Sequence, residues 1–232
     1  INPKNADAQD FLGMAFSKVG NHDEAVGPFK QLITLTPLSH LPYYKLGKEY
    51  AAQGVLDKAI ENINDAIRLK KDFIPGYHQL GLYFEQLKDY PKAIEQYQKI
   101  IEFDPENFEP HFRIGESYRE LGNYDSALEA YRQSSRLNPS HVDSVSSLGW
   151  IYNATQRYQE ASQVYRQAID IDPEFTLAYY NLGVTLGELG KNEEAVPPLR
   201  EAIKLDPKFT PAYYQLGITL LRLDRFEEAL SP

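Results

Sequence analysis

A repeat with a period of 34 residues constrains what this chain can fold into. A leucine–glycine pair, once isoleucine–glycine, recurs at that spacing with its glycines at Gly13, Gly47, Gly81, Gly115, Gly149, Gly183 and Gly217. Twelve residues after each glycine stands an alanine: Ala25, Ala59, Ala93, Ala127, Ala161, Ala195 and Ala229. A supersecondary unit repeated at a fixed period stacks on its neighbours as a solenoid. We therefore expect one continuous array over residues 1–232.

Each repeat is expected to contain two helices. With position 1 placed seven residues before the glycine, helix A spans about positions 1–14 and helix B about positions 17–30. The repeats then cover residues 6–39, 40–73, 74–107, 108–141, 142–175, 176–209 and, in part, 210–232. A proline after helix B ends most repeats, but the second repeat has Lys71 there, so its junction is expected to fray or to continue as helix. Glycines between the helices fit a left-handed helix C-terminus: Gly20, Gly54, Gly122 and Gly190.

The glycine inside helix A indicates a close approach between helices. Glycine in a helix costs about 1 kcal/mol relative to alanine, and it stands at position 8 of seven repeats. Because position 20 of helix B is always alanine, we expect these two small residues to face each other. Larger apolar residues at positions 4, 7, 11 and 24 form one stripe on each helix.

These positions resemble the tetratricopeptide repeat. One copy shows the pattern in Tyr179, Leu182, Gly183, Leu186, Ala195, Leu199, Ala202 and Pro207. The resemblance covers six full repeats and most of a seventh. It implies an all-α, right-handed superhelical solenoid of stacked antiparallel helix pairs, with a concave groove that is lined by helix A and binds segments of partner proteins.

The chain departs from the family pattern at a few positions. Leu32 and Ile100 stand at position 27, where the family usually has a small residue, so the spacing between repeats is expected to change there. Helix B contains Pro28 in the first repeat and Pro197–Pro198 in the sixth. Because proline lacks an N–H group, Pro197 is expected to bend its helix.

Charge and composition exclude several classes of partner. The net charge is −9, whereas nucleic-acid phosphates and anionic membrane surfaces require basic patches. No apolar run approaches the ~20 residues of a membrane span, so direct membrane insertion is not expected. We expect a soluble protein, with the cytoplasm favoured over the periplasm or secretion. The chain starts in mid-motif and ends inside a helix, which predicts a fragment of a longer array.

Signs of catalysis, metal binding or a cofactor are lacking in the sequence. Cysteine is absent, and the five histidines form no His-Glu-x-x-His motif or comparable ligand set. Most glycines are explained by the repeat rather than by a phosphate-binding loop. We therefore predict no catalytic residue, no metal and no cofactor, and we do not expect an enzyme.

The predicted partner-binding residues lie on one face of helix A. Positions 5, 9 and 12 share that face, with position 6 at its edge. The candidates are Tyr44, Lys48, His78, Leu82, Phe112, Glu116, Arg119, Trp150, Tyr180, Asn181 and Tyr214. Aromatic rings contribute strongly to interfaces, so those at position 5 are expected to anchor a peptide. The alternative is that these rings pack against neighbouring A helices.

Trp150, the only tryptophan, has small neighbours on the same helix. Ser146 and Ser147 stand where most repeats carry larger side chains. Small residues beside a large ring could form a pocket with an aromatic wall. The other interpretation is that Trp150 fills the space that the serines leave.

One ligand class of the family can be tested on the sequence. Tetratricopeptide domains that capture a chaperone's C-terminal carboxylate resemble each other in a basic clamp, with Lys and Asn at positions 5 and 9 of one repeat. No repeat here has Lys at position 5 or Asn at position 9. We therefore do not expect a carboxylate clamp, although basic side chains on helix A could still meet acidic groups of a ligand.

The sequence thus predicts a scaffold that binds another protein or peptide in a largely preformed groove. Two alternatives stay open. The first is a substrate-recruiting or regulatory arm of a larger enzyme. The second is a scaffold that self-associates through its uncapped ends, where Phe226 and Leu230 have no following repeat to cover them.

Overall fold

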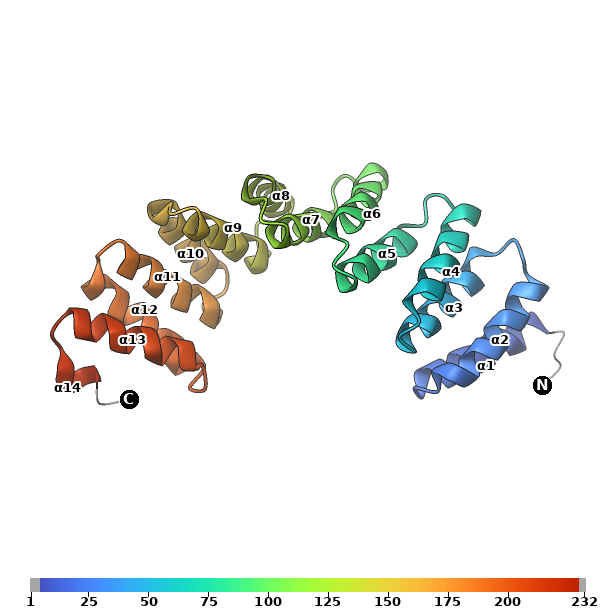
Figure 1. Ribbon diagram of the computed structural model, residues 1–232, viewed down its shortest axis with the longest axis horizontal. Coiled ribbons are helices and arrows are strands. Elements are labelled where there is room, and N and C mark those ends of the chain that lie inside the picture. Colours follow the sequence, from blue (N-terminus) through green and yellow to red (C-terminus); the bar gives the residue numbers. More distant parts are fainter. Residues whose placement is uncertain (1–4, 230–232) are drawn as a thin grey trace. The chain divides into compact units, whose positions relative to one another are not determined.

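The computed structural model describes residues 5–229, and these form helices joined by turns, with no strand among them (Figure 1). The A helices are α1 (Ala6–Lys18), α3 (His40–Ala52), α5 (Ile74–Gln86), α7 (Phe108–Glu120), α9 (Val142–Ala154), α11 (Thr176–Glu188) and α13 (Thr210–Arg222). The B helices are α2 (His22–Leu35), α4 (Leu56–Leu69), α6 (Tyr90–Phe103), α8 (Tyr124–Leu137), α10 (Tyr158–Ile171), α12 (Asn192–Leu205) and α14 (Phe226–Ala229). The predicted helix boundaries are confirmed to within one residue in the six full repeats.

The chain divides after Glu106 into two compact units, the first with α1–α6 and the second with α7–α14. Within each unit, an A helix and the following B helix lie antiparallel, and each pair packs on the next (Figure 1). The predicted all-α fold of stacked helix pairs is confirmed. That residues 1–232 form one continuous solenoid stays a prediction.

The turns between helices A and B have the predicted left-handed residue. All four glycines at position 15 have positive φ, between 72° at Gly122 and 81° at Gly20. Three other repeats place a different residue in the same conformation: Lys88, Gln156 and Asp224, with φ of 58–59°. The turn geometry is therefore set by the fold, and glycine is only the residue that adopts it at the lowest cost.

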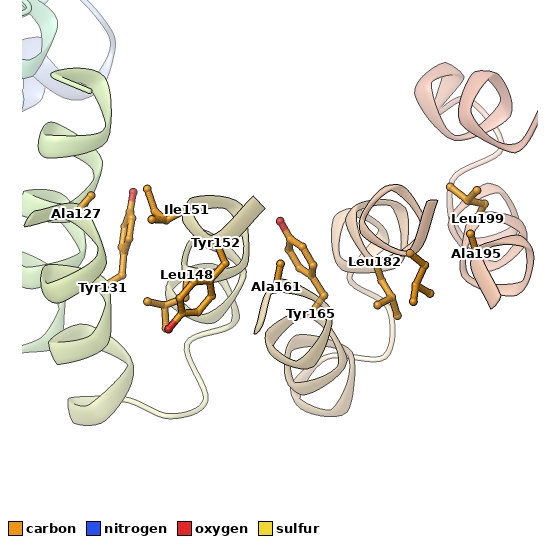
Figure 2. Packing of buried hydrophobic residues seen from close by; sticks show 11 residues of the cluster. Ala127, Tyr131, Leu148, Ile151, Tyr152, Ala161, Tyr165, Leu182, Ala195 and Leu199 are labelled. Carbon is orange, nitrogen blue, oxygen red and sulfur yellow. The ribbon is translucent and has the colours of Figure 1, made fainter. Parts of the chain in front are cut away.

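The core of the second unit is a row of rings and alanines from both helices of each pair. Figure 2 shows Tyr131 of α8 beside side chains of α9, and Tyr165 of α10 between side chains of α9 and α11. Both tyrosines are fully buried, as is Ala161. In the first unit Ala59 and Ile63 hold the equivalent places. In the six full repeats the B helix therefore packs through position 20, which is small, and position 24, which is large.

We expected glycine at position 8 to face alanine at position 20, but its nearest neighbour is the large side chain at position 24. A Cβ built on Gly81 would lie 2.5 Å from the ring of Tyr97, at position 24, and one on Gly115 would lie 2.6 Å from that of Tyr131. The alanine contributes through its backbone in two repeats; the carbonyl oxygen of Ala59, for example, lies 3.0 Å from a Cβ built on Gly47. The glycine therefore makes room for the large side chain.

The junction after the second repeat neither frays nor continues as helix, so that expectation is wrong. Helix α4 ends at Leu69, and Lys70 is extended. The N–H of Phe73 donates to the carbonyl oxygen of Lys70 at 3.2 Å. Phe73 is only 6% exposed, with its ring 4.6 Å from that of His40. Repeats with proline close the same turn with the same bond, as from the Phe175 N–H to the Asp172 carbonyl oxygen at 3.1 Å, so the turn does not require proline.

The other departures from the repeat pattern are accommodated. Helix α12 runs unbroken through Pro197 and Pro198, while the bend expected at Pro197 stays a prediction. Leu32 and Ile100 are both buried within their units. Leu230 and the side chain of Phe226 lie outside the described residues. Within the described chain, every helix is too short or too polar to cross a bilayer.

Candidate functional site

The predicted partner-binding residues fall into two groups, one in each unit. Tyr44, Lys48, His78 and Leu82 belong to α3 and α5 of the first unit. The second unit holds Phe112, Glu116, Arg119, Trp150, Tyr180, Asn181 and Tyr214. The two groups are described separately.

In the first unit the position-5 ring is part of the packing. The ring of Tyr44 meets that of Phe73 edge-on, with 5.1 Å between their centroids, and burial raises the pKa of the Tyr44 hydroxyl. The Lys48 ammonium group lies over the Tyr44 ring, 5.8 Å from its centroid. His78 contacts the ring of Tyr97 edge-on at 6.3 Å. Tyr44 is therefore half-buried and held in place.

The pairing of Tyr44 with Phe73 recurs in the second unit. Phe112 packs edge-on against His141 at 5.1 Å, and Tyr180 against Phe209 at 5.2 Å. In each case a ring at position 5 meets a ring at position 34, just before the next A helix. Sequence reasoning missed this pair, although a spacing of 29 residues between aromatic residues in the same repeat was the available signal.

Tyr214 differs from the other position-5 rings. Its side chain is 72% exposed, and the partial seventh repeat contains no position 34. Among these four rings of the predicted row, only Tyr214 is exposed. Tyr44, Phe112 and Tyr180 are half-buried by their partner rings.

A charged network connects three of the predicted residues. The Tyr131 hydroxyl donates to the Glu116 carboxylate at 2.5 Å, and Arg119 pairs with the same carboxylate at 2.8 Å. Burial, together with Glu116, raises the pKa of Tyr131. The Arg119 guanidinium lies 5.5 Å from the centroid of Trp150, whose ring also meets Tyr124 edge-on at 5.7 Å. Trp150 is therefore fixed from the side of the preceding repeat.

On the side of the following repeat, Trp150 borders an open pocket of about 460 Å³. Its side chain is 40% exposed. The lining residues come from α9, α10 and α11: Trp150, Asn153, Ala154, Tyr158, Tyr180, Asn181, Val184 and Glu188. Ser146 and Ser147 are not among them, so this pocket is not formed by the two serines. The space lies between successive A helices.

The Asn153 side chain of this pocket is positioned by hydrogen bonds with Thr185. The Asn153 amide donates to the Thr185 hydroxyl at 2.8 Å, and that hydroxyl donates to the Asn181 carbonyl oxygen at 2.6 Å. Glu188 is exposed, and no cation of the described chain pairs with it. Sequence reasoning placed Trp150, Tyr180 and Asn181 on this face but missed Tyr158 and Glu188, because a helical-face argument does not show which neighbours meet across the repeat.

One cluster has the residue types of a nucleophilic triad. His141 Nδ1 lies 2.7 Å from Ser144 Oγ, and its Nε2 lies 3.8 Å from an Asp143 carboxylate oxygen. However, Ser144 is 0% exposed, and its hydroxyl contacts the buried Ser134 hydroxyl at 2.8 Å. A substrate cannot reach this oxygen, so the cluster ties α8 to α9. No group of three metal-ligating side chains gathers anywhere in the described residues.

The repeats of this chain match models of known protein families. Models of the tetratricopeptide repeat match residues 42–73, 112–174, 176–209 and 199–231, and a further model of the TPR repeat matches residues 86–118. Two curated relatives, each an Hsp70-Hsp90 organising protein from Plasmodium falciparum, one of them from isolate 3D7, are 34% identical over 76 residues. This match spans 33% of the chain but only 30% and 14% of the two relatives.

Solved structures share the fold at low sequence identity. The C-terminal part of a TPR repeat-containing protein from Cytophaga hutchinsonii has a TM-score of 0.78 at 17% identity, covering 97% of this chain and 88% of that one. A tetratricopeptide repeat protein from Parabacteroides merdae has a TM-score of 0.73 at 19% identity, with 97% and 89% covered. YrrB, a TPR protein with an unusual peptide-binding site, has a TM-score of 0.66 at 21% identity, with 80% and 96% covered.

Proposed function

The chain belongs to the tetratricopeptide repeat family, whose members generally mediate protein–protein interactions, and from this premise we propose that its A helices bind a peptide or protein segment. The observation that carries the proposal is the exposed Trp150 ring beside a pocket of about 460 Å³ between successive A helices. A large ring at a concave, partly polar site is a typical anchor for a bound side chain.

The pocket walls are held before any ligand arrives, which supports the proposal. Trp150 is packed by Tyr124 and Arg119, Tyr180 by Phe209, and Asn153 by Thr185. Side chains that are already ordered lose little conformational entropy on binding. A segment bound here therefore loses less affinity to the ordering of the pocket side chains.

We also propose that the ligand is not a free carboxylate held by a basic clamp. Lys45 is paired with Asp10 at 2.5 Å, and Arg119 with Glu116 at 2.8 Å. These A-helix cations are thus neutralised within their own units. The match to the organising proteins covers too little of their length to assign their partners to this chain. The fold is typical of non-catalytic interaction scaffolds, and the two alternatives, an enzyme arm and a self-associating scaffold, stay predictions.

A selection from a displayed random-peptide library tests this function. Peptides that bind the wild-type chain are then titrated against Trp150→Ala and against Gln163→Ala, a control at an exposed position on α10 outside the pocket. We expect Trp150→Ala to weaken binding about tenfold or more and Gln163→Ala to leave it unchanged. Peptides that bind Trp150→Ala as tightly as wild type, or that lose affinity only with Gln163→Ala, contradict the proposal.

A further inference from the structure

Building on the peptide-binding function proposed above, we infer that the Trp150 pocket accepts a basic side chain, lysine or arginine, of the bound segment. The pocket combines three aromatic residues, Trp150, Tyr158 and Tyr180, with one unpaired carboxylate, Glu188. Aromatic faces attract a cation through their quadrupole, most strongly for tryptophan. The carboxylate supplies the opposite charge.

Glu188 adds a negatively charged carboxylate to the aromatic rings of the pocket. Several carboxylates of the described chain already have a cationic partner; Glu116, Glu160 and Glu194, for example, each contact an arginine or lysine within 3.1 Å. Glu188 lines the pocket, and no cation of the described chain pairs with it. A ligand ammonium or guanidinium group can therefore take that place without displacing an existing partner.

The Arg119 guanidinium on Trp150 does not block this role. It is not among the lining residues, and its charge is offset by Glu116 at 2.8 Å and Glu120 at 3.1 Å. Its position 5.5 Å from the Trp150 centroid shows that this indole already holds one cation by a ring contact. The pocket lies on the side of the following repeat, where α10 and α11 contribute the other walls.

A purely apolar side chain fits the pocket less well. It would desolvate the exposed Glu188 carboxylate without offering it a hydrogen-bond partner, which costs free energy. A lysine or arginine packs its methylene stem on the rings and keeps its charged end at the carboxylate. The net charge of −9 on the chain favours approach of the same ligand.

The only tryptophan of the chain serves as the probe for the test. Trp150 fluorescence is titrated with a short capped alanine–glycine peptide carrying one central lysine, and with the same peptide carrying norleucine, which keeps the methylenes and lacks the charge. We expect the lysine peptide to bind about tenfold more tightly than the norleucine peptide. Glu188→Gln should remove most of that preference. Glu174→Gln, an exposed carboxylate outside the pocket, is the matched control and should retain it.

Each other outcome overturns the inference. Equal binding of both peptides with no effect of Glu188→Gln means that the pocket takes an apolar side chain, and the peptide-binding function then stands. The absence of any fluorescence change at millimolar lysine peptide likewise overturns the basic-ligand assignment. A failure of the peptide-binding function itself is detected separately, when library-selected peptides bind Trp150→Ala as tightly as wild type.

Discussion

The ring of Tyr97 occupies the space that a side chain on Gly81 would fill, since a Cβ built on Gly81 lies 2.5 Å from Cε1 of that ring. The same relationship joins position 8 and position 24 in each of the six full repeats, with Phe29, Ile63, Tyr131, Tyr165 or Leu199 as the large partner. The recurring glycine is thus explained by the volume of one side chain on helix B.

Gly81→Ala is predicted to destabilise the first unit by about 1–3 kcal/mol, because the added methyl group overpacks the Tyr97 ring. Gly217→Ala is the matched control, since no described atom lies within 4 Å of a Cβ at that position. Helix propensity alone then predicts a gain of about 1 kcal/mol. Urea unfolding followed by circular dichroism measures both. A stable Gly81→Ala variant would contradict the packing argument.

The left-handed turn residues give a second prediction. Gln156 has φ of 59°, a conformation that costs a non-glycine residue about 1 kcal/mol. Gln156→Gly is therefore expected to raise the free energy of unfolding by about 1 kcal/mol. Gly122→Ala should lower it by a similar amount, for backbone reasons alone, because a Cβ there would contact nothing. Opposite signs for the two substitutions in thermal and urea unfolding are the expected result; equal signs would refute it.

Rings at position 5 should differ in their effect on stability. Tyr180 packs edge-on against Phe209, whereas Tyr214 is 72% exposed. Tyr180→Ala is expected to cost about 1–3 kcal/mol, and Tyr214→Ala to stay within about 0.5 kcal/mol of wild type. Urea unfolding distinguishes them. Equal losses would show that Tyr214 is also part of the packing, and no loss at Tyr180 would return it to the set of free anchors.

Stability of the second unit should depend on pH through His111. Burial, and to a smaller extent the positive charge of Arg136, lowers the pKa of His111 below its ordinary 6.5. The unfolded chain then binds a proton more readily than the folded chain, so stability falls as the pH drops through 6.5 toward the lower folded pKa. His111→Gln is expected to reduce this fall between about pH 7.5 and about pH 5. Unfolding curves at both pH values check it; an unchanged difference would contradict it.

Much of the fold could be predicted from the sequence because the repeat shows each local choice several times. Proline after helix B, glycine at position 15 and the apolar stripes each specify a local backbone or face. The junction at Lys71 shows where this reasoning fails. There the turn forms without proline, and Phe73 packs on His40 and Tyr44, which lie about 30 positions earlier in the chain.

The sequence predicted which helix face carries the candidate site, but not which residues of other helices line it. Helical spacing alone put Trp150, Tyr180 and Asn181 on the same side of their helices. Only the tertiary structure brought Tyr158 and Glu188 to the Trp150 pocket and buried Tyr44, Phe112 and Tyr180 against rings at position 34.

The secondary structure, the helix boundaries and the buried stripe follow from the amino-acid sequence alone, since these depend on backbone preferences and on periodicity along one chain segment. The tertiary structure decided which side chain fills the space at each glycine, which rings are free, and where an open pocket remains. The physical reason is that packing depends on the volumes and charges of side chains from different repeats, and these meet only after the helices have stacked.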